Sequence, residues 1–177
     1  MKKTLIILAI ALIACIAGLG LWGATLPRGH QATSRVVVAA PPESVYNVMR
    51  DFATTPTWWK DVKRIEAVPG TDGWERWRET SGGISFIVII DQEEPPLRFR
   101  TRVDTTGHPP FGGTWTYQTA IASGGHTTVT ITEDGTVDNP FFRVVSKLMG
   151  THATLNSYLT ALGVKFGQTV TPAHVTP

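Results

Sequence analysis

A long amphipathic pattern near the end of the chain constrains the fold more than any other feature. Between Asn139 and Gly163, a set of mostly apolar residues recurs at spacings of four and three: Phe141, Val145, Leu148, His152, Leu155, Leu159 and Leu162. This period is typical of a helix with one apolar face. Asn139 suits the N-cap, Pro140 the first turn and Gly163 the stop. We therefore predict one long helix, whose apolar face must pack against a large apolar partner.

A run of strands before this helix provides that partner. Segments rich in β-branched or alternating apolar residues are separated by Gly, Pro and Ser turn signals, which predicts strands over 31–39, 63–68, 74–80, 84–91, 97–104, 114–122 and 127–133. Pro41-Pro42-Glu43 opens a helix with Val45 and Met49 on its core face, and a short helix is expected over 57–62. Together these elements predict an α+β fold. A helix cannot fill a strongly curved antiparallel sheet, so we expect a cavity between them.

The segment 97–104 indicates that the sheet has one face in water. Leu97, Phe99, Thr101 and Val103 alternate with Arg98, Arg100, Arg102 and Asp104. The arginine row fits either an anion site or a solvated outer face paired with acids on neighbouring strands. The outer face is the favoured interpretation, because cross-strand pairs of opposite charge are common on exposed sheet faces.

An uncharged apolar stretch, Thr4–Leu26, follows Lys2 and Lys3 at the N-terminus. As a helix it would reach about 34 Å, enough to cross the hydrocarbon core of a bilayer. The two lysines favour a cytoplasmic N-terminus, which places the rest of the chain on the extracytoplasmic side. We therefore predict a single-pass anchor in the cell membrane.

Two alternatives to an uncleaved anchor stay open. Leu12-Ile13-Ala14-Cys15 resembles a lipobox, which would make the protein a lipoprotein attached at Cys15. A cleaved signal peptide is the other alternative. The anchor is favoured because apolar character continues beyond Cys15 to Trp22.

Charge and composition exclude several classes of function. Of the 16 Lys and Arg residues, Lys2 and Lys3 lie in the N-terminal segment, and the other 14 equal the 14 Asp and Glu residues. The remaining domain lacks the basic excess that nucleic-acid binding needs, so no nucleic-acid partner is expected. The single cysteine and five scattered histidines form no metal-ligand pattern. We assign no metal, no cofactor and no nucleophile motif.

The chain resembles the SRPBCC (START-like, helix-grip) superfamily, in particular its polyketide cyclase/dehydrase and lipid-transport subgroup. The residues that carry the resemblance are Ala40–Tyr46, Asp51-Phe52 to Trp58-Trp59, Phe111–Tyr117, Thr130–Gly135 and Asn139–Phe142. The resemblance implies a helix-grip fold, a curved antiparallel sheet wrapped around the long C-terminal helix. We expect three regions: a membrane anchor or signal segment over 1–28, the helix-grip domain over 29–166 and a flexible tail over 167–177. Many soluble members lack the N-terminal segment.

Aromatic and apolar residues of the predicted sheet and helix are the candidates for lining the cavity. Because Tyr and Trp combine a large apolar ring with one polar atom, they suit an aromatic, uncharged pocket. The candidate ligand-binding residues are Trp58, Phe86, Val88, Phe99, Trp115, Tyr117, Met149 and His152. Among the acids, Glu75, Glu79 and Asp91 lie in predicted strands, but nothing in the sequence shows two of them converging on one inner face.

Three functions remain open at this point. The favoured one is a membrane-anchored domain that binds a hydrophobic small molecule, lipid-like or aromatic, with no catalytic residue. An enzyme resembling polyketide cyclases is the second, with His152 and Tyr117 as its acid–base pair. The third is a non-catalytic envelope interaction module, which predicts a collapsed cavity and an exposed apolar patch near Phe111 or Trp58.

Overall fold

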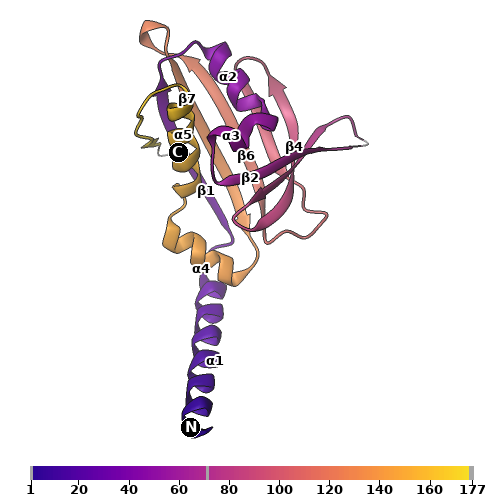
Figure 1. Ribbon diagram of the computed structural model, residues 1–177, viewed down its shortest axis with the longest axis vertical. Helices are drawn as coiled ribbons and strands as arrows, with labels where there is room; N and C mark the ends of the chain where they lie inside the picture. Colours follow the sequence, from indigo (N-terminus) through magenta and orange to yellow (C-terminus); the bar gives the residue numbers. More distant parts are fainter. Residues whose placement is uncertain (1, 71, 176–177) are drawn as a thin grey trace.

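The computed structural model describes residues 2–70 and 72–175. Helix α1 (Lys2–Thr25) projects away from a domain built on one curved antiparallel sheet (Figure 1). The sheet has eight strands in the order β2-β3-β4-β5-β6-β7-β1-β8. The strands in chain order are β1 (Gly29–Val38), β2 (Val62–Val68), β3 (Glu75–Ser81), β4 (Ile84–Glu94), β5 (Arg98–Val103), β6 (Phe111–Ile121), β7 (Thr127–Val137) and β8 (Ala173–His174).

The predicted strands are all present, and the largest differences lie at one end of β6 and β7. The sequence predicts a strand only from Thr114, but β6 already begins at Phe111, which pairs with Val137 of β7. Gly113 has a φ of 124°, and a Cβ there would clash with the carbonyl oxygen of Asp134. Glycine therefore lets the two strands continue past a point where a side chain would separate them.

The core lies between the inner face of the sheet and the helices that cover it. Helix α2 (Pro42–Arg50) buries Val45, Tyr46 and Met49 in this core. A 3-10 turn, η1 (Phe52–Thr54), and the short helix α3 (Thr55–Trp58) follow it. The short helix expected over 57–62 thus begins earlier and ends at Trp58, because the chain at Val62 has already joined β2.

The prediction of one long C-terminal helix is wrong in one respect: the helix is broken. Helix α4 (Pro140–Met149) ends at Gly150, and α5 (Ala153–Lys165) begins three residues later. Gly150 has a φ of 86°, a conformation that other residues rarely adopt and that cannot continue a helix. The N-cap prediction is confirmed, since Asn139 Oδ1 accepts from the amide of Phe141 at 2.9 Å.

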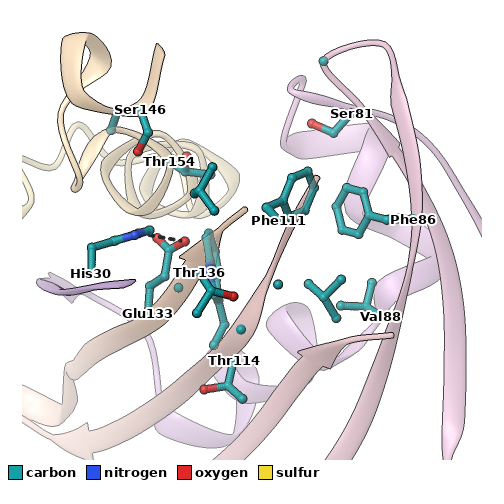
Figure 2. A pocket seen from close by; sticks show the side chains of 18 of the residues that line it. His30, Ser81, Phe86, Val88, Phe111, Thr114, Glu133, Thr136, Ser146 and Thr154 are labelled. Atoms are coloured by element: carbon teal, nitrogen blue, oxygen red, sulfur yellow. Dashed lines mark ion pairs between the residues drawn. The ribbon is translucent and has the colours of Figure 1, made fainter. Parts of the chain in front are cut away.

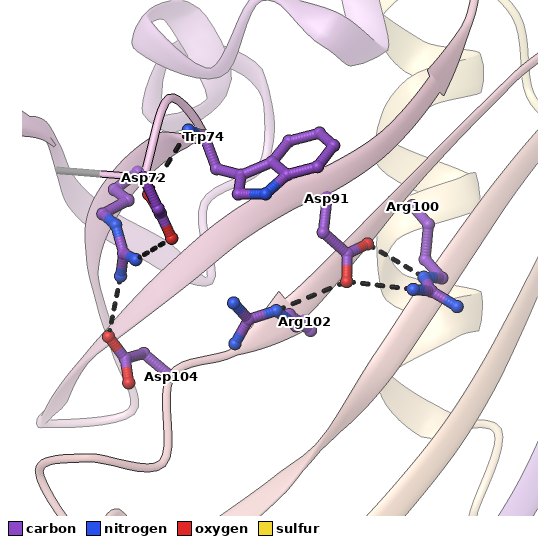
Figure 3. A network of polar contacts seen from close by, with 7 residues as sticks. Asp72, Trp74, Asp91, Arg100, Arg102 and Asp104 are labelled. Atoms are coloured by element: carbon purple, nitrogen blue, oxygen red, sulfur yellow. Dashed lines mark hydrogen bonds and ion pairs between the residues drawn. The ribbon is translucent and has the colours of Figure 1, made fainter. Parts of the chain in front are cut away.

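The arginine row of β5 lies on the outer face of the sheet, as its alternation predicts. Arg100 forms a two-point contact with Asp91, at 2.9 and 3.0 Å, and Arg102 reaches the same carboxylate at 3.3 Å (Figure 3). Arg98 pairs with Glu94 at 3.4 Å. These arginines are thus occupied by acids, and they do not assemble an anion site.

The segment expected as a flexible tail, 167–177, is held against the domain over its described part. Strand β8 pairs with β1, with Ser34 opposite His174. The side chain of Val170 fills the space beside Gly163, where a Cβ would clash with one of its methyl carbons. Residues 176–177 lie outside the described residues.

Candidate functional site

A cavity of about 470 Å³ lies between the inner face of the sheet and the helices α4 and α5. It is found at the end of the sheet nearest α4, which itself lies next to α1 (Figure 1). The lining is rich in aromatic side chains, contributed by Phe52, Trp59, Phe86, Phe111, Trp115, Tyr117 and Phe142. No lysine or arginine of the described residues lines it.

Side-chain alternation along the strands directs apolar residues toward the wall of this cavity. Phe86 and Val88 are two residues apart on β4, so both side chains point to the inner face. Phe86 meets Phe111 of β6 edge to face, with ring centroids 4.9 Å apart (Figure 2). On the helix side, Val145 and Met149 of α4 are one turn apart and complete the wall.

An ion pair lies on the opposite side of the cavity. His30 of β1 sits over Gly135 of β7, and its Nε2 is 3.5 Å from Oε1 of Glu133 (Figure 2). The interaction with Glu133 raises the pKa of His30 above its usual value. Gly135 makes this position possible, because a Cβ there would clash with Cε1 of His30.

An aromatic cluster with neutral hydroxyl groups lies where Tyr117 of the cavity wall meets the core. Tyr117 stacks on Phe99 with centroids 4.3 Å apart, and the ring of Tyr158 on α5 lies 5.6 Å from that of Tyr117. Burial raises the pKa of both tyrosines far above the ordinary value, so both remain protonated. Tyr117 faces the cavity, whereas Phe99 is fully buried behind it.

One more carboxyl group lines the cavity, that of Glu79 on β3. Its cross-strand neighbours are Ile65 on β2 and Phe86 on β4, both apolar. Desolvation alone raises the pKa of Glu79 to about 7. The carboxyl group of Glu79 therefore gains or loses its proton near neutral pH.

Five of the candidate ligand-binding residues line the cavity: Phe86, Val88, Trp115, Tyr117 and Met149. The other three do not. Trp58 packs edge-on against Tyr158 in the core, and Phe99 lies under Tyr117. His152 occupies the break between α4 and α5, where its ring stacks on that of His174 with centroids 3.9 Å apart.

The acid–base pair proposed for an enzyme is not assembled. Tyr117 is buried in the aromatic cluster, whereas the half-buried His152 is held by His174 outside the cavity lining. The helix break explains the difference, because Gly150 turns the chain before His152 can share a continuous face with Leu155. No predicted pair of catalytic groups therefore meets in this site.

Sequence reasoning missed Glu79, His30 and Glu133 as lining residues. The signal for Glu79 was present in the strand pattern, since Trp77 and Glu79 share one face and Trp77 stacks on Phe52 of the core. His30 and Glu133 carried no comparable signal, because their proximity depends on strand register. Within residues 2–70 and 72–175, no three His, Cys, Asp or Glu side chains are grouped to hold a metal ion.

Residues 29–162 match the family model for polyketide cyclase/dehydrase and lipid transport proteins. The chain belongs to this family. The match covers the whole sheet except β8, together with α4 and most of α5. A search of curated proteins gave no match.

Solved structures show the same fold at low sequence identity. A START superfamily protein from Mycobacterium smegmatis is 20% identical, with a TM-score of 0.62 over 78% of this chain and 97% of its own. A protein from Thermus thermophilus is 19% identical, with a TM-score of 0.62 over 77% and 97% of the two chains. The Zhui aromatase/cyclase from Streptomyces sp. R1128 is 15% identical, with a TM-score of 0.57 over 76% and 93%. Family and fold together support a domain that binds hydrophobic ligands.

Proposed function

We propose that this protein is a membrane-anchored domain that holds a hydrophobic small molecule, lipid-like or aromatic, in the cavity between its sheet and α4–α5. The observation that carries the proposal is the cavity itself. Its volume of about 470 Å³ falls within the range of small-molecule pockets, and its walls are mainly aromatic and aliphatic. The alternative of an interaction module predicts a collapsed interior, whereas the side chains leave this cavity between them.

Helix α1 supports the anchoring part of the proposal. It is the one helix of the described residues that is long and apolar enough to cross a membrane. A signal sequence near an N-terminus has the same properties. The anchor is favoured because α1 packs on the folded domain through Gly23, where a Cβ would clash with the carbonyl oxygen of Pro140. Lys2 and Lys3 favour an extracytoplasmic domain.

Two threonines on α5 allow a matched test of the cavity. Thr154 and Thr160 are both exposed, but only Thr154 lines the cavity. We expect the full chain in lipid nanodiscs to bind 1-naphthalenemethanol, detected by quenching of tryptophan fluorescence. Thr154→Trp should weaken binding at least about tenfold by filling the space, while Thr160→Trp should leave it unchanged. Equal binding by the two variants would show that the probe binds elsewhere.

A further inference from the structure

Glu79 places a carboxyl group on the inner face of the sheet, where it has no partner among residues 2–70 and 72–175. Among the described residues, no base or hydrogen-bond donor lies within bonding distance of it, whereas the other acid that lines the cavity has one: Glu133 pairs with His30. The side-chain neighbours of Glu79 on its own face are apolar or uncharged: Ile65, Trp77, Ser81 and Phe86. A carboxyl group in such surroundings is costly unless something else satisfies it.

The other ionisable groups of the cavity do not compensate for Glu79. Tyr117 on β6 and Tyr158 on α5 are close enough for the charge of Glu79 to raise the pKa of each, and both are neutral. His30 is engaged by Glu133. The described lining residues include two carboxyl groups, one histidine and no lysine or arginine, so their net charge is negative once Glu79 is ionised above neutral pH.

We infer that Glu79 makes the cavity selective for hydrophobic molecules that carry a basic amine over those that carry a carboxylate, a refinement that rests on the proposed binding function. The ammonium group of such a ligand supplies the hydrogen bonds and the positive charge that Glu79 lacks, while its apolar body contacts the aromatic walls. A fatty acid or another anion would bring a second negative charge beside the carboxylate of Glu79, and repulsion between the two charges disfavours its binding.

Three probes of one shape test this inference on the full chain in lipid nanodiscs: 1-naphthylmethylamine, 1-naphthalenemethanol and 1-naphthoic acid. Isothermal titration, with empty nanodiscs subtracted, gives the affinity of each. At pH 8 we expect the amine to bind at least about tenfold more tightly than the acid, the effect of one hydrogen bond to a charged group. Glu79→Gln should abolish this preference. Glu66→Gln, which changes an exposed acid on the neighbouring strand β2, should preserve it.

The pH dependence gives a second readout that needs no variant. Protonation of Glu79 on going from pH 8 to pH 6 removes its charge, so amine affinity should fall while alcohol affinity stays nearly constant. His30, whose pKa is raised by its contact with Glu133, gains positive charge on acidification and acts on the amine in the same direction. His30→Gln should therefore retain most of the fall, and Glu79→Gln should remove most of it.

The outcomes separate this inference from the binding function. If none of the three probes binds, the proposed binding function fails. If all bind equally, or the acid binds best, the cavity binds ligands but the charge selection by Glu79 is wrong. An amine preference that survives in Glu79→Gln likewise overturns the role of Glu79.

The contact between α1 and α4 supports a separate inference. Arg143 of α4 is buried, and its guanidinium donates to backbone carbonyl oxygens: to Val137 at 2.8 Å, to Asp138 at 2.7 Å, and to Gly23 of α1 at 3.2 Å. Phe141 also packs beside Gly20 of α1. These contacts fix the start of α4 against the last turns of α1, the end that leaves the hydrocarbon core in the proposed anchor, on which this second inference rests.

One exposed face of α4 is apolar. Phe141 and Leu148, two turns apart on this face, are 44% and 73% exposed among the described residues. We propose that this face lies in the interfacial region of the same bilayer that α1 crosses, with lipid as its partner. An amphipathic helix held parallel to a membrane surface buries such a face among headgroups and upper acyl chains.

Quenching of a fluorescent label by nitroxide-labelled lipid tests whether α4 lies at the membrane surface. In a Cys15→Ser background, a bimane label is attached to Leu148→Cys on α4, or to Thr160→Cys on α5 as the control. With nanodiscs that contain headgroup-nitroxide phosphatidylcholine, we expect quenching several-fold stronger at position 148 than at position 160. Phe141→Cys provides a second α4 site if the first variant folds poorly. Equal quenching on the two helices would overturn the proposal.

Discussion

Helices α4 and α5 derive from one continuous apolar pattern, yet they occupy opposite environments. On α5, Leu155, Leu159 and Leu162 are all 0% exposed and pack in the core. On α4, Val145 is 50% exposed and Leu148 is 73% exposed. The same spacing thus predicts a helix with an apolar face in both halves. It does not predict whether protein, ligand or lipid covers that face.

The break at Gly150 allows the two halves to differ. A straight helix would carry His152 and Leu155 along the same line as Leu148, so one partner would have to cover the whole stripe. With Gly150 at a φ of 86°, the chain changes direction, and α4 can pack across the end of α1 while α5 packs on β1 and α3. The core therefore stabilises α5, whereas the contacts with α1 position α4.

The largest expected effect separates the two helices directly. Leu159→Ala on α5 should lower the free energy of unfolding by about 2–5 kcal/mol, because it leaves a cavity in a close-packed core. Leu148→Ala on α4 should change it by less than about 0.5 kcal/mol in detergent, because the side chain is exposed. Urea unfolding followed by circular dichroism measures both. Similar losses for the two variants would contradict the assignment of environments.

The second prediction concerns the interior that α5 helps to cover. Glu79 reports on this interior, because its charge acts on Tyr158 of α5. The folded-state pKa of Glu79 is raised from 4.5 to about 7, so its protonated form stabilises the fold below pH 4.5 and that stability is lost as pH rises through 7. Relative to Glu79→Gln, the unmodified domain should therefore lose about 3 kcal/mol between pH 4.5 and 8. Parallel pH profiles of unfolding for the two proteins would show that Glu79 is solvated.

A substitution of Arg143 tests whether its contacts with α1 hold α4 in place. Arg143→Met removes the donors of several buried carbonyl groups, which should cost about 1–3 kcal/mol. Hydrogen exchange should quicken along α4 and the end of α1 while α5 remains protected. Lys147→Met, an exposed change on the same helix, is the control. Faster exchange throughout α5 would mean that the two helices behave as one unit.

The smallest expected effect concerns the break. Gly150→Ala should destabilise the domain by about 1–2 kcal/mol, because the backbone conformation at this position is strained for a residue with a Cβ. Gly107→Ala is the matched control, since nothing lies within 4 Å of a Cβ there and its φ is not positive. A stabilised Gly150→Ala variant would indicate that a continuous helix is tolerated.

Much of the fold was predictable because its signals are local. Alternation in 97–104 placed Phe99 and Thr101 inside and Arg100 outside, and Asn139 with Pro140 located the start of α4. The break was not predictable from the pattern. A glycine inside an amphipathic repeat is often tolerated in a helix, and only the competing contacts with α1 and with the core show why Gly150 ends one here.

The site was predictable only where strand alternation or helix spacing decided which way a side chain points. Phe86, Val88, Trp115 and Tyr117 follow from alternation, and Met149 from the position of the helix. The misplacement of His152 follows from the break. The contact between His30 and Glu133 depends on the register of β1 with β7, which leaves no mark in either segment alone.

Native mass spectrometry of the full chain, released from nanodiscs formed directly from membranes, tests most directly whether the cavity holds a guest. We expect a fraction of the chains to carry one bound hydrophobic molecule that dissociates on collisional activation. That fraction should drop sharply in Thr154→Trp and persist in Thr160→Trp. Chains that emerge at their bare mass, or that carry the same adducts in both variants, would contradict binding in the cavity.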